Sequence, residues 1–291
     1  MVAGNKKIRK RSSFTKIRGY MDILKSKFIQ EMIHIMNVMY NHGWNERNGG
    51  NISYLLSEEE VSKYLDTSKL IRDIPIKFNA KELIGKYFLV TGTGKYFKNI
   101  TTAPEEILGI VKVNKTGNKL HLLWGFEHEG KPTSELPTHF MSHISRLKVD
   151  PKNRIIMHCH ATHLISMSFS HSLDENELTK TLWEMCTECI VVFPDGVSTI
   201  PWIVPGTNEI GEATSKKMES SRLVVWPFHG IYAAGREIDE TFGLIETAEK
   251  AAKVYTYMMA QGGKKQTITD KDLKDLADAF GVVPKNGILK V

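Results

Sequence analysis

The amino-acid sequence predicts a single α/β domain, and three observations support this fold class. Short apolar runs bounded by Gly, Asn or Pro are typical of strands, and longer segments with apolar residues at helical spacing are typical of helices. The two kinds of segment interleave along the 291 residues, without the strict β-α-β repetition of a nucleotide-binding fold. A hydrophobic content of 41% and a charged content of 25% fit an ordinary globular protein and exclude disordered, collagen-like and membrane-spanning classes.

The first half of the chain is expected to begin with one helix and to continue with strands. Residues 24–40 predict a helix, because five apolar side chains recur at helical spacing: Phe28, Met32, Ile35, Met36 and Met39. The sequence Asn41-His42-Gly43 is a typical helix stop. Residues 57–80 are polar and are interpreted as a surface excursion. Short runs bounded by turn residues predict strands over residues 52–55, 87–91, 107–113 and 119–124.

The second half of the chain is expected to alternate helices with short strands. Apolar runs of four or five residues are the size of buried strands. They predict strands over residues 154–158, 190–193 and 223–226. Helical periodicity predicts helices over residues 136–147, 161–169, 175–185, 207–219, 237–260 and 270–280. Together these elements complete one α/β domain.

The basic character of the sequence comes from its first twenty residues. The whole chain has a formal charge of +6, but residues 1–20 hold seven lysines and arginines and no acid. The other 271 residues carry 32 basic and 33 acidic side chains, a net charge of −1. We expect residues 1–21 to be a disordered extension, with a transit peptide or an artefact ahead of a start at Met21 as alternatives, and residues 22–291 to form the domain. Nucleic-acid binding through this leader is the remote alternative.

The cysteines indicate the redox state of the compartment and do not indicate a metal or redox site. Cys159, Cys186 and Cys189 cannot pair completely, and this favours a reducing, cytoplasmic compartment. Cys186 and Cys189 form a Cys-x-x-Cys motif, but the second pair of a zinc ribbon and the context of a thioredoxin-like redox site are both missing. We interpret them as ordinary buried or half-buried thiols. Glu188, which lies between them, is of greater chemical interest.

Two histidines in one predicted strand are the first candidates for a site. His158 and His160 are separated by one residue, so their side chains project to the same side of the strand and Cys159 projects to the other. Two imidazoles at this spacing can each give a metal ion a nitrogen ligand. They can equally cap the strand by hydrogen-bonding to the backbone. The metal interpretation therefore needs a third ligand.

His229 is our choice for the third ligand. It directly follows an apolar strand and precedes Gly230, and the end of a strand is where an α/β protein builds a site. The nearer candidates are His139, His143 and His163. The first two are four residues apart on a predicted helix, and we interpret that pair as a polar helix face.

Glu135 is the candidate carboxylate. In Pro132-Thr133-Ser134-Glu135-Leu136-Pro137, a hydroxyl residue before a proline-containing helix start is an N-cap pattern, and an acid in the first turn suits the helix dipole. The functional alternative is a carboxylate beside a metal, which would act as a general base or as a fourth ligand. The residues alone leave both open.

Two glycine-rich turns are candidates for anion binding. They are Arg47-Asn48-Gly49-Gly50-Asn51 and Thr91-Gly92-Thr93-Gly94-Lys95. Backbone N–H groups freed by glycine, with Asn and Thr side chains, form nests suited to phosphate. Neither turn has the spacing of a P-loop, and either could be a plain hairpin turn.

Taken together, the motifs resemble the class II sugar-phosphate aldolase and epimerase family from about residue 29 to residue 280. Seven motifs in order carry the resemblance. They are Glu46-Arg47-Asn48-Gly49-Gly50-Asn51, Val90-Thr91-Gly92-Thr93-Gly94-Lys95, Pro132-Thr133-Ser134-Glu135-Leu136-Pro137, Met157-His158-Cys159-His160-Ala161-Thr162, Thr187-Glu188-Cys189, Phe193-Pro194-Asp195-Gly196-Val197 and Trp226-Pro227-Phe228-His229-Gly230. The resemblance implies a central, mainly antiparallel β-sheet flanked by helices. It also implies a homotetramer that acts on a small sugar phosphate, with neither nucleic acid nor membrane as a partner.

The resemblance also implies a site and a reaction. One zinc ion per subunit would be held by His158, His160 and His229. Glu135 would be the catalytic acid/base, and Glu188 a second functional carboxylate. A phosphate pocket would consist of Asn48, Gly49, Thr93, Gly94, Thr133 and Ser134. The implied reaction is the reversible, zinc-dependent retro-aldol cleavage of a ketose 1-phosphate to dihydroxyacetone phosphate and L-lactaldehyde. Other aldolases and pentulose-phosphate 4-epimerases of the family are the alternatives.

Overall fold

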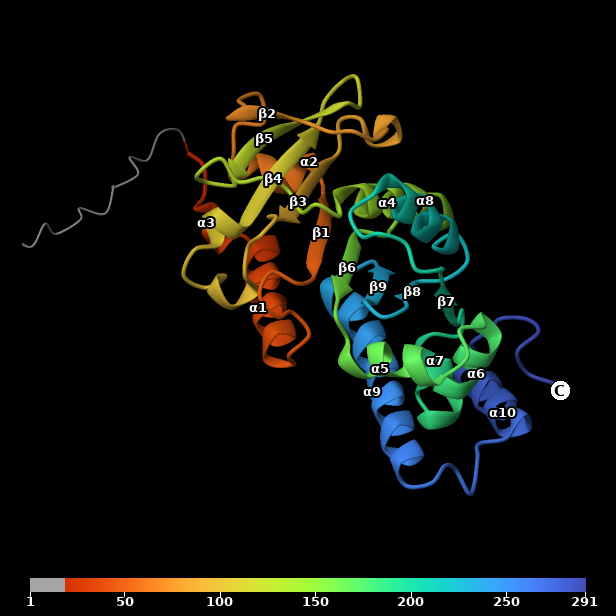
Figure 1. Cartoon of the computed structure of the whole chain (residues 1–291). Helices are drawn as coiled ribbons and strands as arrows, with labels where there is room; N and C mark the ends of the chain where they lie inside the picture. The colour runs from red at the N-terminus through yellow and green to blue at the C-terminus, as the bar shows by residue number, and fades with distance from the viewer. Residues whose placement is uncertain (1–18) are drawn as a thin grey trace, which may run out of the picture.

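One nine-stranded sheet organises the chain. A computed structural model describes residues 19–291, and its strands run in the order β2-β5-β4-β3-β1-β6-β9-β8-β7 (Figure 1). Among the described residues, β7 and β8 form the one parallel pair, and every other neighbouring pair is antiparallel. The strands are β1 (Asn51–Leu56), β2 (Arg72–Pro75), β3 (Tyr87–Thr91), β4 (Leu108–Val113), β5 (Lys119–Gly125), β6 (Ile155–Cys159), β7 (Val197–Thr199), β8 (Leu223–Trp226) and β9 (Gly230–Gly235).

Helices cover both faces of this sheet, which confirms an α/β fold with a mainly antiparallel sheet. The α-helices are α1 (Lys27–Asn41), α2 (Glu58–Ser62), α3 (Pro104–Ile107), α4 (Leu136–Val149), α5 (Thr162–Ser170), α6 (Glu175–Met185), α7 (Cys189–Val192), α8 (Asn208–Lys217), α9 (Ile238–Ala260) and α10 (Asp270–Phe280). Three short 3-10 turns are Ile23–Lys25, Lys81–Leu83 and Phe97–Asn99. None of the helices within residues 19–291 has the length and apolarity that crossing a bilayer requires.

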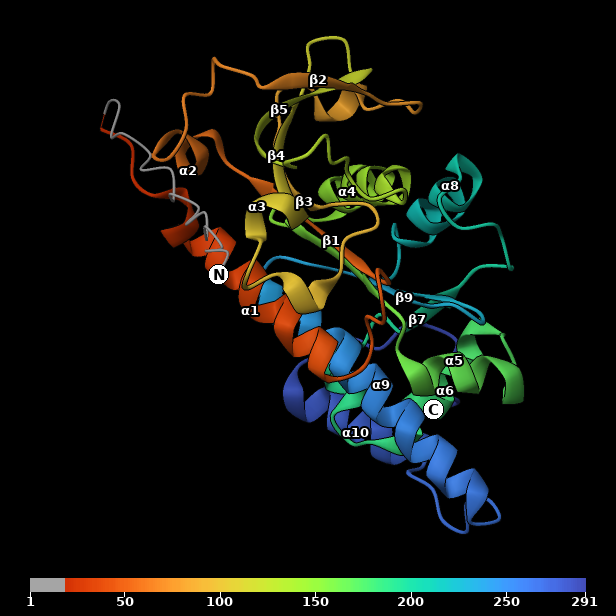
Figure 2. The ribbon, with the colours of Figure 1, turned by 60° about the vertical axis from the view of Figure 1, so that its left-hand side comes forward.

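The alternation of side chains along the central strands divides the core into two layers. Ile155, Met157 and Cys159 of β6 face one side, where the largest apolar cluster includes residues of α1, α5, α6, α7, α9 and α10. Figure 2 shows α1 and α9 side by side on this face. Ile156 faces the other side, where α4 and α8 pack against each other and onto the sheet (Figure 1). His158 belongs to this second face, so it lies beneath α4.

The predicted helices and most predicted strands are confirmed, with shifts at their ends. The first helix begins at Lys27 and not at residue 24, because Ser26 occupies the N-cap and its Oγ accepts a hydrogen bond from the Ile29 amide at 3.4 Å. The helices predicted over residues 175–185 and 270–280 match α6 and α10. The basic extension predicted over residues 1–21 falls mostly on residues 1–18, which lie outside the described residues.

The strand predicted over residues 190–193 is wrong, because this segment forms the helical turn α7. The amides of Val192 and Phe193 donate to the carbonyls of Glu188 and Cys189, each at 2.9 Å, which is a helical pattern. A four-residue apolar run has no periodicity that separates a strand from a helical turn. The strand in this region is β7, which follows the Pro194-Asp195-Gly196 turn.

Two further strands were not predicted. The stretch interpreted as a surface excursion contains α2 and the edge strand β2, in which Ile74 is the one buried side chain and Pro75 ends the pairing. The other is β9, which is buried throughout and lies between β6 and β8. Its glycines and alanines are weak strand formers, so its sequence does not resemble an apolar, β-branched strand.

Gly230 at the start of β9 should be intolerant of any side chain. A Cβ there would lie 2.2 Å from the Cys159 carbonyl oxygen and 3.1 Å from His158 Cε1. We expect Gly230→Ala to lower the free energy of unfolding by about 1–3 kcal/mol, because β9 and β6 must separate to admit the methyl group. Gly243→Ala in α9 is the matched control: its Cβ meets no atom within 4 Å. It should raise stability by about 0.5–1 kcal/mol. Urea midpoints of both variants give the comparison, and equal midpoints would contradict it.

Candidate metal centre and active site

Three histidines from two neighbouring strands converge at one end of the sheet. His158 is in β6, His160 follows that strand, and His229 lies in the turn that joins β8 to β9. Because β6 and β9 pair with Cys159 opposite Ile231, the residue after β6 lies next to the turn before β9. One nitrogen of each ring lies within 4.8 Å of the others. The structure therefore brings together the three residues that the sequence indicated as ligands.

The geometry of this triad fits a metal ion. The Nδ1 of His158 donates to the Ile231 carbonyl at 3.0 Å, and its fully buried Nε2 has no hydrogen-bond partner among residues 19–291. The Nδ1 of His160 lies 2.7 Å from Glu46 Oε1, which leaves its Nε2 free to face His229. The Nε2 atoms of His160 and His229 are 3.2 Å apart. Two nitrogens on a tetrahedral zinc ion are separated by about 3.3 Å when each bond is about 2.0–2.1 Å.

Burial favours the neutral form of two of these imidazoles, those of His158 and His229, and a neutral imidazole is the form that binds a metal. Burial lowers the pKa of His158 well below its ordinary value, and the nearby His229 and His160 lower it further. Burial, and then the proximity of His160, lower the pKa of His229 to about 4. The carbonyl and carboxylate that accept from the two Nδ1 atoms orient the rings, in the way that outer partners fix metal-bound histidines.

Glu135 is directed toward the triad and away from its helix. It occupies the N-cap position of α4 but makes no capping hydrogen bond with its side chain. Its side chain is instead buried, and its Oε2 lies 3.7 Å from His158 Nε2. This oxygen accepts hydrogen bonds from Asn51 Nδ2 at 2.8 Å and from the Tyr232 hydroxyl at 2.5 Å. The N-cap interpretation is wrong, because Glu135 itself, and not a hydroxyl residue, occupies the N-cap position and no acid lies in the first turn of α4. The carboxylate instead faces the histidines.

Opposing effects set the proton affinity of Glu135. Burial raises its pKa, because the charged form loses solvent. The hydrogen bonds from Tyr232 and Asn51 stabilise the charged form and lower the pKa, and the net result is a raised value. A carboxyl group held in this balance beside three clustered histidines is suited to exchange protons.

Asn51 and Tyr232 are site residues that the sequence reasoning did not single out. Both lie directly opposite His158 in the sheet, Asn51 on β1 and Tyr232 on β9, so all three share one face. The Tyr232 ring stacks on His158 with centroids 4.4 Å apart and an interplanar angle of 13°. Asn51 stands in a motif already noted, but Tyr232 belongs to the strand that was not predicted. Recognising β9 would have placed Tyr232 in register with His158.

The residues predicted to bind phosphate lie on three segments that meet beside Glu135. The start of β1 meets the end of β3, where the Ile52 amide donates to Thr91 Oγ1 at 3.1 Å. Beyond β3, the amide of Thr93 donates to the Lys131 carbonyl at 2.9 Å, which places the Thr93-Gly94 turn beside Thr133 and Ser134. Asn48 and Thr93 are exposed, and a Cβ at Gly49 would lie 2.8 Å from His160 Cε1. The assignment of these residues to phosphate stays a prediction.

Glu188 does not join this group within its own chain. It is exposed and precedes α7, where Cys186 Sγ donates to its Oε2 at 2.9 Å. That hydrogen bond lowers the pKa of Glu188. Cys186 is half-buried and Cys189 is buried, and both are free thiols. The interpretation of His139 and His143 as a polar helix face is wrong, because both are fully buried against β1.

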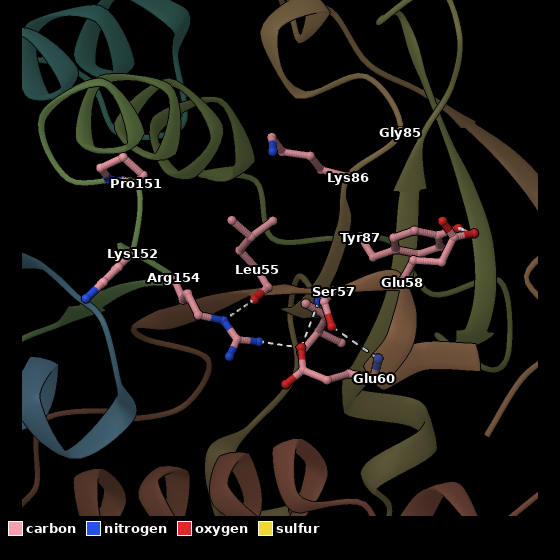
Figure 3. A pocket seen from close by; sticks show the side chains of 11 residues that line it. Leu55, Ser57, Glu58, Glu60, Gly85, Lys86, Tyr87, Pro151, Lys152 and Arg154 are labelled. Atoms are coloured by element: carbon pink, nitrogen blue, oxygen red, sulfur yellow. Dashed lines mark hydrogen bonds and ion pairs between the residues drawn. The ribbon is translucent and has the colours of Figure 1, made fainter. Parts of the chain in front are cut away.

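The triad opens into a cavity of about 390 Å³ whose wall includes His160, His229, Glu46 and Phe228. A larger cavity of about 570 Å³ lies at the opposite end of β6 (Figure 3). Within it, Arg154 donates to the Leu55 carbonyl at 2.9 Å and to Glu60 at 2.6 Å, and among the described residues it holds no cluster of histidines like the triad. We therefore place the candidate active site at the triad.

Comparisons with known proteins find a matching family and similar sequences. The family described as "Class II Aldolase and Adducin N-terminal domain" matches residues 30–256. A protein named rhamnulose-1-phosphate aldolase from Listeria monocytogenes serotype 4b is 63% identical over 268 residues, which cover 92% of this chain and 98% of the relative. A protein of the same name from Mannheimia succiniciproducens is 46% identical over 270 residues, which cover 92% and 99%.

Solved structures share the fold. A sugar-phosphate aldolase from Thermotoga maritima superposes with a TM-score of 0.69 at 27% identity, over 81% of this chain and 98% of that chain. An L-fuculose 1-phosphate aldolase superposes with a TM-score of 0.56 at 20% identity, over 87% of this chain and 95% of that chain. At that identity, the second likeness concerns the fold alone.

The lowered pKa values predict how metal binding depends on pH. Because His229, with a pKa of about 4, and His158 are already neutral at pH 5, neither needs to release a proton when a metal binds. Affinity should fall as the pH falls, but the logarithm of the binding constant should change by at most one per pH unit between pH 5 and 6. If all three ligands were ordinary imidazoles with a pKa of about 6.5, this change per pH unit would approach three. Cobalt(II) titrations followed by visible absorption measure this slope, with circular dichroism to confirm folding, and a slope of two or more would refute the expectation.

Proposed function

The chain belongs to the class II aldolase and adducin N-terminal domain family, and from this premise we propose that it cleaves L-rhamnulose 1-phosphate. The reaction is a reversible, zinc-dependent retro-aldol cleavage to dihydroxyacetone phosphate and L-lactaldehyde in rhamnose catabolism. The names of its relatives support the substrate, and the seven sequence motifs resemble L-rhamnulose-1-phosphate aldolase more closely than other members. The cysteine content supports a cytoplasmic location.

One observation carries the proposed chemistry: a buried carboxyl group stands next to an unpartnered ring nitrogen of the triad. Glu135 Oε2 is 3.7 Å from His158 Nε2, so a metal held by the three histidines would lie within reach of the base. When bound, a divalent metal supplies a Lewis acid that stabilises negative charge on the ketone and hydroxyl oxygens of the substrate. Three nitrogen ligands with an open position are typical of catalytic zinc, and imidazoles also bind other divalent metals.

In this proposal, Glu135 donates the proton to C3 in cleavage and removes it in the aldol direction. Cleavage between C3 and C4 leaves an enediolate, which must take up a proton at C3 to give dihydroxyacetone phosphate. In the aldol direction the same carboxylate removes that proton. Tyr232 and Asn51 both donate to Oε2, so they hold the carboxyl group in one orientation while its proton is exchanged.

The phosphate is held by neutral groups. We propose that Asn48, Gly49, Thr93, Gly94, Thr133 and Ser134 bind it through side-chain donors and backbone N–H groups. Two direct connections support this assignment: Ser134 precedes Glu135 in the chain, and Gly49 lies against His160. Binding the remote phosphate would then position the bond that breaks.

We propose that Glu188 acts in the active site of a neighbouring subunit. The family resemblance implies a homotetramer with sites near subunit contacts, and Glu188 is exposed on its own chain without contact to the triad. We propose that it orients the aldehyde or takes the C4 hydroxyl proton in the site of another copy.

The substrate is tested by comparing three sugar phosphates. We expect the highest kcat/KM with L-rhamnulose 1-phosphate in an assay coupled to dihydroxyacetone phosphate, a lower value with L-fuculose 1-phosphate, and no 4-epimerisation of a pentulose phosphate. Removal of bound metal should abolish cleavage, and zinc should restore it. A higher kcat/KM for fuculose phosphate would reassign the substrate, and cleavage by metal-free protein would end the zinc mechanism.

Glu135→Gln should lower kcat by about 10²–10⁴-fold, because the amide keeps the shape of the side chain but cannot exchange the proton. Metal content should stay at the wild-type value, since the three histidines are intact. Elemental analysis and steady-state kinetics on the same preparation separate the two effects. Wild-type kcat in this variant would rule out the acid/base role.

A further inference from the structure

A line of buried polar side chains runs from Glu135 into the protein, between α4 and β1. Glu135 Oε2 accepts from Asn51 Nδ2 at 2.8 Å, and Asn51 Oδ1 meets His139 Nε2 at 2.5 Å. His139 Nδ1 meets Ser53 Oγ at 2.8 Å, and Ser53 Oγ meets His143 Nε2 at 2.9 Å. We call Asn51, Ser53, His139 and His143 the buried chain. Three of its members are fully buried, and Asn51 is 6% exposed.

The buried chain forms because the spacing of polar residues along α4 matches their spacing along β1. Glu135, His139 and His143 are four residues apart along α4, so they lie on one side of the helix about 6.0 Å apart. Asn51 and Ser53 are two residues apart on β1, so they lie on one face of the sheet about 6.7 Å apart. Helix and strand therefore present their polar side chains at nearly equal intervals. Each helix residue can then bond the strand residue across from it.

In the buried chain, each donor donates its hydrogen bond to the member that lies nearer to Glu135. Asn51 donates to the carboxylate with its amide nitrogen, so its oxygen must accept, and His139 must carry its proton on Nε2. The bare Nδ1 of His139 then accepts from the Ser53 hydroxyl, whose oxygen in turn accepts from His143 Nε2. The last atom, His143 Nδ1, has no partner among residues 19–291 and is unprotonated in this arrangement.

The opposite direction would cost more free energy. It would require protonated Glu135 to donate to Asn51, and every later bond would reverse, which would leave a proton on the buried Nδ1 of His143. A buried N–H group without an acceptor carries the full desolvation penalty, whereas an unused lone pair on a neutral ring costs less. Burial also keeps both rings neutral, because it lowers the pKa of His139 far below its ordinary value and that of His143 to about 3.

From these contacts we propose that Ser53, His139 and His143 are positioning residues for Glu135, and that they form a one-directional hydrogen-bond chain that holds the carboxylate toward the histidine triad. The inference rests on the proposed function, in which Glu135 exchanges the proton at C3. Aligned bonds polarise one another, so the donation from Asn51 is stronger than that of an isolated amide. The chain acts on orientation, since its members do not contact the metal-binding nitrogens.

Ser53→Ala tests the chain by removing one hydroxyl group from its middle. We expect kcat to fall by about 10–100-fold, because a small displacement of a reacting group is enough to cost this much. KM and bound metal should change by less than about threefold, since neither the phosphate segments nor the triad is touched. Ser142→Ala is the matched control: Ser142 is as fully buried on α4, but its hydroxyl has no hydrogen-bond partner among the described residues. Unchanged kcat in Ser53→Ala, or an equal loss in Ser142→Ala, would overturn the proposal.

A second measurement needs no variant and no activity. In metal-loaded wild-type protein with ¹⁵N-labelled histidine rings, the ¹⁵N shifts should show His139 and His143 as neutral rings protonated at Nε2. A ring protonated at Nδ1, or a charged ring at pH 7, would overturn the chain even if Ser53→Ala failed to fold. The two proposals fail separately, because wild-type activity in Glu135→Gln would refute the catalytic role while leaving these tautomers as expected.

Discussion

The pairing of β6 between β1 and β9 is the constraint on which the rest of the site depends. It aligns Asn51, His158 and Tyr232 across three strands, so a histidine of the triad lies in one row with the two side chains that donate to Glu135. The same pairing places the β8–β9 turn beside the end of β6, where His229 meets His160. A shift by one residue would turn these side chains into the opposite core, so the register fixes both the fold and its chemistry.

The site needs no strong charge from the rest of the molecule. Outside residues 1–20 the chain has a net charge of −1, and the groups proposed to hold the phosphate are neutral. Beneath α4, two imidazoles, an amide and a hydroxyl form hydrogen bonds with one another in a buried region, and His143 Nδ1 is left without a partner among residues 19–291. Buried polar groups are tolerated when they are paired in this way, and such pairing also restricts them to one arrangement.

The sequence predicted those parts of the fold and the site whose signal is local. Periodicity located α6 and α10 to the residue, and the spacing of His158 and His160 indicated that they share a face. What it could not supply was pairing between distant segments. Tyr232 lies on a strand rich in Gly and Ala. The contacts of His139 and His143 with Ser53 exist only because β1 packs beneath α4. Short apolar runs such as residues 190–193 are ambiguous for the related reason that a turn of helix and a strand share one composition.

The hairpin of β8 and β9 carries both His229 and Tyr232, three residues apart, and this links two functions mechanically. Any movement of the hairpin displaces a ligand of the triad and the hydroxyl that restrains Glu135 at the same time. If an ion in the triad orders this hairpin, thermodynamic reciprocity requires that order at the carboxylate favours binding of the ion to the same extent. An ion held by the triad, as proposed above, would therefore also order Glu135, and metal loading would then be a maturation step for the whole proposed site.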